Sequence, residues 1–322
     1  MTDRRAPRGC SLRYARVYEA ATACPASRRG VVAPGMLAPM TVGPPERSSQ
    51  QGGALRPLVE LSEAACRALR GVVFDIDDTM TRGGRLEPDA YDALCRLTRA
   101  GLEAVAVTGR PLAWADVLSR LWPVAVAVGE NGAGWTWRDQ RGAMRCAHYD
   151  DDAARARYQP LFERVRAAVR DALPHVRETE DMSGRRCDLA FDVGERVSLP
   201  AREIAKLRAL IEAAGARCVV SSVHAHAVPG DWDKARGSVR AVRDALDVDI
   251  EREPARWLFV GDSGNDAEAF AFFPLSVGVA NVRDHLANLP RPPAFITDGA
   301  RGQGFAELAR HVLAARAEAP HG

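Results

Sequence analysis

The stretch Val72-Val73-Phe74-Asp75-Ile76-Asp77-Asp78-Thr79 decides the fold, because a short apolar run ends there in three carboxylates and a threonine. Between Gly71 and Gly83, such a run predicts a buried strand of a parallel sheet, and open α/β sheets bind ligands at the carboxyl ends of their strands. Unpaired carboxylates are costly to bury, so these acids indicate a bound cation. Hard oxygen ligands suit Mg²⁺, which leaves coordination positions for phosphate oxygens. The stretch therefore predicts metal-assisted phosphate chemistry.

Helices and strands alternate from Pro57 onward. Pro88 and Gly101 bracket one helix, as expected for a proline in the first turn and a glycine just after the end. The other predicted helices cover residues 58–69, 112–121, 152–172, 201–214, 234–246 and 266–272. The predicted strands cover residues 72–75, 102–107, 124–128, 186–193, 217–222, 257–260 and 275–279. Alternation of this kind predicts a doubly wound parallel sheet of the α/β class, with right-handed crossovers.

The alternation changes near Trp137, where two helices and two strand-like segments interrupt the pattern until Gly230. We therefore expect a core of residues 56–137 and 230–317 with an inserted α+β cap of residues 138–229. Residues 1–55 lack periodicity, which predicts a disordered N-terminal extension. Their Arg-rich, acid-poor composition also suits a mitochondrial transit peptide, and an upstream start codon is a third alternative, with Met36 or Met40 as the true initiator.

The formal net charge of +2 hides an asymmetry along the chain. Residues 1–56 hold nine arginines against three acids, so the remainder is mildly acidic and offers no basic stripe for nucleic acid. Seven cysteines without a CxxC pair predict neither a zinc site nor a disulfide framework and favour a cytoplasmic protein. No apolar run has the length of a membrane span. We expect a small-molecule partner and either a monomer or a homodimer.

Further polar features follow other predicted elements of the core. Thr108 ends the second strand, Lys234 begins a helix after the insert, and the segment 261–266, GDSGND, ends the fourth core strand. Those that directly follow parallel strands can converge on one crevice with Asp75 and Asp77. Lys234 is one of only two lysines in the chain, which indicates that a compact ammonium is needed at that position.

The order of these motifs resembles that of the haloacid dehalogenase superfamily of phosphohydrolases, over residues 57–316. The position of the insert, between the third strand and Lys234, is similar to the type II caps of subgroup B, the Cof-like group. The segment 261–270, GDSGNDAEAF, resembles that of sucrose-phosphate and mannosyl-3-phosphoglycerate phosphatases. The resemblance implies a magnesium-dependent phosphatase that hydrolyses a small phosphorylated metabolite, in particular a sugar phosphate.

The resemblance also implies a role for four residues of the site. Asp75 would attack phosphorus and form an aspartyl phosphate. Asp77 would protonate the leaving oxygen and then deprotonate the attacking water. Thr108 would donate a hydrogen bond to a phosphoryl oxygen, and Lys234 would neutralise its charge.

A metal site is implied at the same place. Mg²⁺ would be held by Asp75, the backbone carbonyl of Asp77 and Asp262. Asn265 and Asp266 would orient these ligands. Each motif also has a structural explanation: the acids can form a solvated turn, and GDSGND can open a helix with Asp266 as its cap.

Substrate choice is expected to depend on the cap and on the loops that face it. The segment 184–188 offers guanidinium groups that suit anionic or polyhydroxy ligands, although an exposed charged strand edge is the simpler explanation for any one of them. His224 and His226 alternate with other residues, so both face one side of a strand. The candidate substrate-binding residues are Gly109, Arg110, Asn131, Arg185, Arg186 and His224.

Two other functions remain open at the level of sequence. A phosphomutase of the phosphomannomutase type shares the superfamily and the cap type. A non-enzymatic phosphoacceptor, like the receiver module of two-component signalling, also combines acids, a threonine and a lysine in this order. Such a module is far shorter and has no insert between threonine and lysine, so phosphatase is the favoured prediction.

Overall fold

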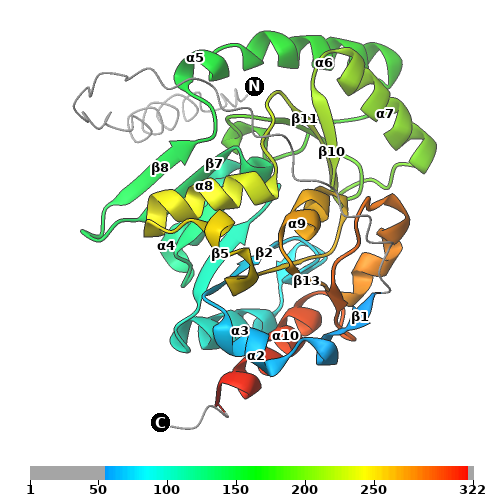
Figure 1. Ribbon diagram of the computed structural model, residues 1–322. Helices are drawn as coiled ribbons and strands as arrows, with labels where there is room; N and C mark the ends of the chain where they lie inside the picture. The colour runs from blue at the N-terminus through cyan, green and yellow to red at the C-terminus, as the bar shows by residue number, and fades with distance from the viewer. Residues whose placement is uncertain (1–54, 318–322) are drawn as a thin grey trace, which may run out of the picture. The chain divides into compact units, whose positions relative to one another are not determined.

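The computed structural model describes residues 55–317, so the predicted extension over residues 1–55 lies, apart from Leu55, outside the described residues. A nine-stranded sheet forms the core, in the order β1-β14-β13-β12-β2-β5-β6-β7-β8 (Figure 1). Its strands are β1 (Arg56–Pro57), β2 (Gly71–Phe74), β5 (Glu103–Val107), β6 (Val126–Gly129), β7 (Gly134–Arg138), β8 (Met144–His148), β12 (Trp257–Gly261), β13 (Leu275–Gly278) and β14 (Phe295–Ile296).

The sheet is doubly wound, which confirms the predicted fold class. After the short edge strand β1, the chain enters the centre of the sheet at β2, continues on one side through β5 and β6, and returns on the other side through β12, β13 and β14. All pairs from β1 to β6 along the sheet are parallel, whereas β7 and β8 add an antiparallel hairpin at the far edge. The order of strands therefore reverses beside β2, which is where ligands of open α/β sheets bind.

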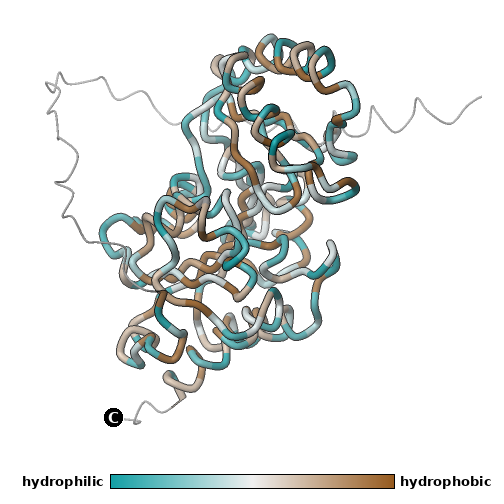
Figure 2. The backbone as a smooth tube through the Cα atoms, turned by 90° about the vertical axis from the view of Figure 1, so that its right-hand side faces the viewer, coloured by the Kyte–Doolittle hydropathy of each residue, from teal (hydrophilic) through white to brown (hydrophobic). Residues whose placement is uncertain are grey.

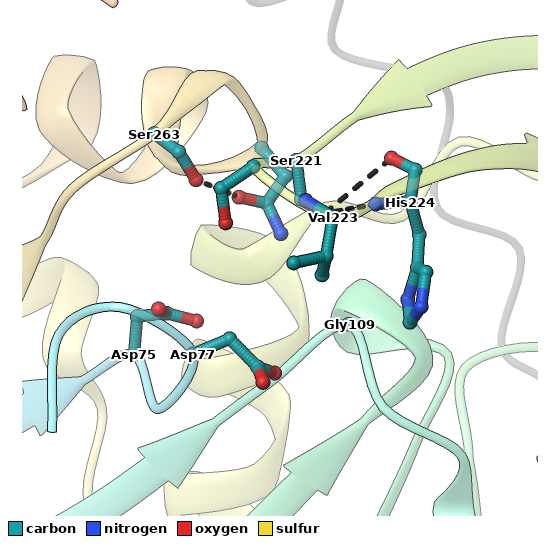
Figure 3. Close-up of a pocket in the computed structure, with 9 residues that line it drawn as sticks. Asp75, Asp77, Gly109, Ser221, Val223, His224 and Ser263 are labelled. Atoms are coloured by element: carbon teal, nitrogen blue, oxygen red, sulfur yellow. Dashed lines mark hydrogen bonds between the residues drawn. The ribbon is translucent and has the colours of Figure 1, made fainter. Parts of the chain in front are cut away.

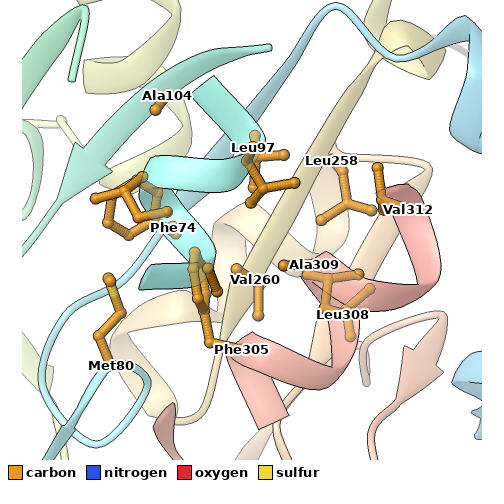
Figure 4. Packing of buried hydrophobic residues seen from close by; sticks show 14 of the residues in the cluster. Phe74, Met80, Leu97, Ala104, Leu258, Val260, Phe305, Leu308, Ala309 and Val312 are labelled. Carbon is orange, nitrogen blue, oxygen red and sulfur yellow. The ribbon is translucent and has the colours of Figure 1, made fainter. Parts of the chain in front are cut away.

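Helices cover both faces of this sheet, so its strands are apolar on both sides. Val72 and Phe74 of β2 belong to one buried cluster, and Val73 between them belongs to the other. The first cluster lies under four helices: α2 (Glu63–Ala68), α3 (Pro88–Arg99), α4 (Leu112–Leu121) and α10 (Gly302–Ala317). Figure 4 shows Phe74 of this cluster packed near Phe305. The second lies under α8 (Lys234–Leu246) and α9 (Ala267–Phe272). In Figure 2 the hydrophobic segments (brown) gather in the interior of the described residues, and hydrophilic segments (teal) are common at the surface.

Several helices begin and end where the sequence predicts. α4 and α8 have the predicted bounds, and α3 starts at Pro88 and is followed by Gly101 in the left-handed region, at a φ of 81°. The single helix predicted over residues 58–69 is wrong. A short 3₁₀ turn (Leu58–Glu60) comes first, and α2 starts separately after Ser62, whose hydroxyl accepts a hydrogen bond from the backbone of Ala65.

The long helix predicted over residues 152–172 is also divided. α5 (Asp152–Arg155) and α6 (Tyr158–Ala172) are separate, and the helix N-cap of α5 is Asp151. At the break, the hydroxyl of Tyr158 donates to Asp150 and its ring packs 5.8 Å from that of Trp232. These tertiary contacts, which the amphipathic pattern does not show, fix the start of α6.

The cap contains a three-stranded antiparallel sheet in the order β10-β11-β9. Its strands are β9 (Leu189–Asp192), β10 (Arg217–Val220) and β11 (His224–Val228), and its apolar residues pack with those of α6 and α7 (Ala201–Ala213). The predicted cap strands 186–193 and 217–222 correspond to β9 and β10, and the strand expected to carry His224 and His226 is β11. The predicted start of the cap at residue 138 is corrected, because the β7–β8 hairpin spans that position and pairs with the core sheet.

Within residues 55–317, no helix combines the length and the apolar character needed to cross a bilayer.

Candidate active site

The candidate site lies where the chain leaves β2 and β12, beside the start of α8. Asp75 follows β2 directly, and its backbone N–H donates to Val260 of the neighbouring strand at 2.9 Å. Asp262 follows β12 in the same way, and both carboxylates are buried. Parallel pairing of β2 with β12 therefore brings together two acids that are far apart in the sequence.

Lys234 joins this group from the first turn of α8 and is fully buried. Its Nζ donates to Oδ1 of Asp75 at 2.5 Å and to Oδ1 of Asp266 at 2.6 Å. Burial alone would lower the pKa of Lys234, but the two carboxylates outweigh it and hold this pKa above its usual value. Arg236, two residues further along the helix, is exposed and pairs with Asp231 instead.

The helix start is set by Asp233, whose side chain accepts a hydrogen bond from the backbone N–H of Arg236 at 2.8 Å. This cap fixes where α8 begins and thereby places the ammonium of Lys234 beside Asp75.

Oxygen atoms of Asp75, Asp262 and Asp266 all lie within 4.8 Å of one another. Burial raises the pKa of Asp75 to about 7 despite the nearby ammonium of Lys234, and burial with the charge of Asp75 raises the pKa of Asp262 well above its usual value. Three buried carboxylates face one ammonium, so the group has an excess of negative charge that a divalent cation would balance. The donor set, all carboxylate oxygen, fits Mg²⁺.

Asp266 is already engaged by protein groups. Its Oδ2 accepts from the backbone N–H groups of Asp262 and Ser263 at 2.8 and 3.0 Å, and its Oδ1 accepts from Lys234. This arrangement suits a residue that orients Asp262 and Lys234. Asn265 donates from Nδ2 to Oδ1 of Asn131 at 2.9 Å, which ties the GDSGND loop to the loop after β6.

Asp77 lies outside the carboxylate cluster, and its side chain is held by Arg110. The guanidinium donates to the Asp77 carboxylate through Nε at 3.0 Å and through Nη2 at 2.8 Å. Thr108 Oγ1 lies 3.5 Å from Asp77 Oδ2 and accepts from the backbone N–H of Arg110 at 3.0 Å. Arg110 also pairs with Glu195 of the cap, at 3.0 Å. Arg110 thus links Asp77 to the cap, and Thr108 lies beside this pair.

A turn of the cap covers the site. A small pocket is bounded by core residues on one side and by the turn between β10 and β11 on the other, and Figure 3 shows Asp75, Asp77 and Gly109 opposite Val223 and His224. The free space holds about one water molecule. The residues that line the pocket are Asp75, Asp77, Gly109, Ser221, Ser222, Val223, His224, Ser263 and Asn265.

The remaining predicted substrate residues differ in position. His224 lines the pocket, and its Nε2 lies 2.8 Å from a carboxylate oxygen of Glu195. Arg185 is buried at the junction of cap and core, where Nη1 donates to the backbone carbonyl of Gly109 at 2.9 Å. Arg186 is exposed, so the structure does not bring its guanidinium into the pocket.

Two residues with important contacts were missed from the sequence. Glu130 is buried, and its carboxylate accepts hydrogen bonds from the backbone N–H groups of residues 186–188 of the cap. It also accepts one from the backbone N–H of Leu112. Asn281 donates to Oδ2 of Asp262 at 2.9 Å. Asn281 follows β13 by three residues, so the rule that located Asp75 and Asp262 could have found it. Nothing in the sequence distinguishes Glu130 from other acids.

No protein-family model matches this chain. No curated protein matches it either. Solved structures do resemble it. The C-terminal domain of trehalose-6-phosphate phosphatase from C. albicans is 10% identical, with a TM-score of 0.58 over 82% of this chain and 99% of that one.

Two further structures have the same architecture. The sucrose-phosphatase of Synechocystis sp. PCC6803, solved with sucrose and phosphate, is 17% identical, with a TM-score of 0.55 over 76% of this chain and 98% of that one. A haloacid dehalogenase-like hydrolase from B. subtilis is 15% identical, with a TM-score of 0.50 over 76% of this chain and 99% of that one. The chain is an α/β protein with an inserted cap. Its fold is that of the haloacid dehalogenase-like hydrolases.

Proposed function

We propose that this protein is a magnesium-dependent phosphatase that hydrolyses a small phosphorylated metabolite through an aspartyl-phosphate intermediate. The observation that carries the proposal is the buried ammonium of Lys234, bonded to Asp75 and to Asp266 within a cluster of carboxylates at the carboxyl ends of β2 and β12. A structural ion pair would not need a third buried acid, Asp262, beside it.

Asp75 is the proposed nucleophile. Lys234 holds its Oδ1, which fixes the orientation of the carboxylate while one oxygen attacks phosphorus. The new bond joins Asp75 to phosphorus as the bond from phosphorus to the ester oxygen breaks. Water then attacks the aspartyl phosphate and releases inorganic phosphate. The Lys234 ammonium offsets the negative charge of the phosphoryl oxygens in both steps.

Asp77 is the proposed acid and base. It gives a proton to the departing ester oxygen and takes one from the attacking water. In the structure its carboxylate is paired with Arg110, which is also bound by Glu195 of the cap. Asp77 has to leave Arg110 to reach the ester, and we propose that movement of the cap draws the guanidinium away. Thr108 would then donate its hydroxyl to a phosphoryl oxygen.

Magnesium is the proposed cofactor. It would be held by Asp75, the backbone carbonyl of Asp77 and Asp262, with Asn265 and Asp266 in support, and it would neutralise charge on the phosphoryl group.

We propose that the substrate is a sugar phosphate, which the protein hydrolyses to the free sugar and inorganic phosphate. We propose the cytoplasm as the place of this reaction. Support for the sugar phosphate comes from the fold likeness to a sucrose-phosphatase and a trehalose-6-phosphate phosphatase. Beside the pocket, the cap presents His224 and the carboxylate of Glu195, which can accept hydrogen bonds from hydroxyl groups. Since the closed pocket holds about one water molecule, the cap must open for such a substrate to enter.

The test is phosphate release from a panel of sugar phosphates and from p-nitrophenyl phosphate, with Mg²⁺ or with a chelator. We expect Mg²⁺-dependent release by the wild type and none by Asp75→Asn. Release that persists in Asp75→Asn, or in chelator, contradicts the proposal. If phosphate appears only as an isomerised ester after a sugar bisphosphate is added, the protein is a phosphomutase instead.

A further inference from the structure

Helix α4 exposes three large apolar side chains in one line. The exposed fractions are 46% for Trp114, 52% for Val117 and 71% for Leu121. Spacings of three and four residues place these side chains on the same face of the helix. The opposite face packs into the core through Leu112, Ala115 and Leu118. We call the three exposed residues the α4 stripe.

Charges of both signs lie beside the α4 stripe. Asp116 and Arg120 form an ion pair within the helix, with Nε of Arg120 2.9 Å from the carboxylate, and both side chains are about half exposed. An exposed ion pair of this kind contributes little within one chain, so its groups are available to other partners. Large apolar side chains grouped on a surface and bordered by charges are typical of a contact with another protein.

We propose that the α4 stripe is the contact between two copies of this chain, with their α4 helices antiparallel about a two-fold axis near Val117. In this register Trp114 lies against Leu121 of the second copy. The same register brings Asp116 of each copy to Arg120 of the other. Because one surface supplies both halves of each contact, the α4 stripe is complementary to itself, as a two-fold interface requires.

The size of the α4 stripe sets the strength expected of the dimer. A standard interface buries about 1,600 Å² in total, and three side chains from each copy provide only part of that. We therefore expect a dimer that dissociates on dilution. The contact also lies close to the candidate site, because the guanidinium of Arg110, which holds Asp77, lies 5.2 Å from the centre of the Trp114 ring.

The first experiment is light scattering of the full chain over a dilution series. We expect the mass of two chains at high concentration for the wild type and the mass of one chain for Leu121→Arg. Val59→Arg is the matched control, because Val59 is 76% exposed but belongs to the turn after β1. Leu121 is exposed at the last position of α4 and is not one of the candidate site residues, so phosphate release and thermal melting can report whether each variant is folded.

A charge exchange tests the register. Asp116→Arg places arginine against Arg120 of the second copy and should shift the equilibrium to monomer by at least tenfold. The double variant Asp116→Arg with Arg120→Asp restores opposite charges across the axis and should restore the dimer. A wild type with the mass of one chain at every concentration overturns the proposal. So does a dimer that none of these substitutions affects, because its contact lies elsewhere.

Discussion

Lys234 is the residue on which the charge balance of the site depends. Its ammonium is fully buried and forms ion pairs with Asp75 and Asp266. Both carboxylates are buried as well, so neither would have water to compensate its charge if the ammonium were removed. Removing one member of a buried ion pair typically costs 3–5 kcal/mol, because the remaining charge is left without compensation. Lys234 thus stabilises the fold in addition to its proposed chemical role.

We expect Lys234→Met to lower the free energy of unfolding by about 3 kcal/mol and to abolish phosphate release. Urea unfolding with Mg²⁺ removed measures the first effect, so that a bound cation does not mask it. The chain provides a matched control in its other lysine: Lys206 is exposed and donates to the backbone carbonyl of Ala172. Lys206→Met should change stability by less than about 0.5 kcal/mol. Equal effects of the two substitutions would contradict the assignment.

His226 makes the stability of the cap depend on pH. It is fully buried, and its Nδ1 lies 2.8 Å from a carboxylate oxygen of Asp188. Burial lowers the pKa of His226 to about 4, although Asp188 acts in the opposite direction. The unfolded chain binds a proton at this histidine below about pH 6.5 and the folded chain only below about pH 4. Its contribution to stability is therefore present above pH 6.5 and is lost as the pH falls toward 4.

The variant His226→Gln should isolate this effect. At pH 8 the wild type should be more stable than the variant, and at pH 5 its advantage should be smaller by about 2 kcal/mol. The measurement is the difference in unfolding free energy between the two proteins at each pH. Because other titrating groups are common to both, they cancel in the difference. A difference independent of pH would show that His226 keeps an ordinary pKa.

At the scale of elements, α8 is placed by a contact between two glycines. A Cβ on Gly237 would lie 2.3 Å from Cα of Gly132, and a Cβ on Gly132, whose φ is 111°, would lie 2.2 Å from the carbonyl oxygen of Asp233. Helix α8 can therefore lie directly against the loop after β6. This close approach sets the position of its first turn, and with it the distance from Lys234 to Asp75.

We expect Gly237→Ala to push α8 away from the loop. The free energy of unfolding should fall by about 1–3 kcal/mol, and phosphate release should fall at least tenfold, because a small displacement of Lys234 breaks its bond to Asp75. Arg236→Ala, on the exposed face of the same helix, is the control and should retain both properties. Unchanged activity in Gly237→Ala would show that α8 is not positioned by this contact.

The elements also show how far the sequence could predict the structure. The core strands β2, β5, β6, β12 and β13, together with α4 and α8, were predictable because apolar runs, prolines and caps are local signals. The short strands β1 and β14 were not predicted. The break between α5 and α6 depends on Tyr158 and Trp232, which are distant in sequence. The β7–β8 hairpin was missed because its strands are part of the core sheet yet lie where the helix–strand alternation stops. Local pattern carries no information on such pairing.

The same contrast applies to the candidate site. Asp75 and Asp262 were predictable because the ends of parallel strands share one edge of the sheet. Lys234 was predictable because it is one of only two lysines and begins the helix after the insert. The contacts that hold the cap were not, since Glu130 and Arg185 act through backbone groups of the opposite part of the fold. A sequence shows which residues follow a strand, but it does not show which backbone N–H groups will donate hydrogen bonds to a buried carboxylate.

At the scale of the whole described unit, cap and core are joined by buried polar contacts rather than by the covalent connections alone. Arg110 links Asp77 to Glu195, and Arg185 links the cap to the carbonyl of Gly109. The pocket between cap and core holds about one water molecule, so the cap lies close over the candidate site. In the proposed reaction these contacts would break and reform, and closure of the cap would exclude bulk water from the phosphorylated aspartate.

The most direct test of this account is whether Asp75 becomes phosphorylated. The wild type would be mixed with its best substrate and Mg²⁺, quenched in acid within the first turnover, digested and examined by mass spectrometry. We predict one phosphoryl group on the peptide that contains Asp75, present in the wild type and missing in Asp75→Asn. Phosphate release by the wild type without this adduct, or with the adduct on another residue, would contradict the account.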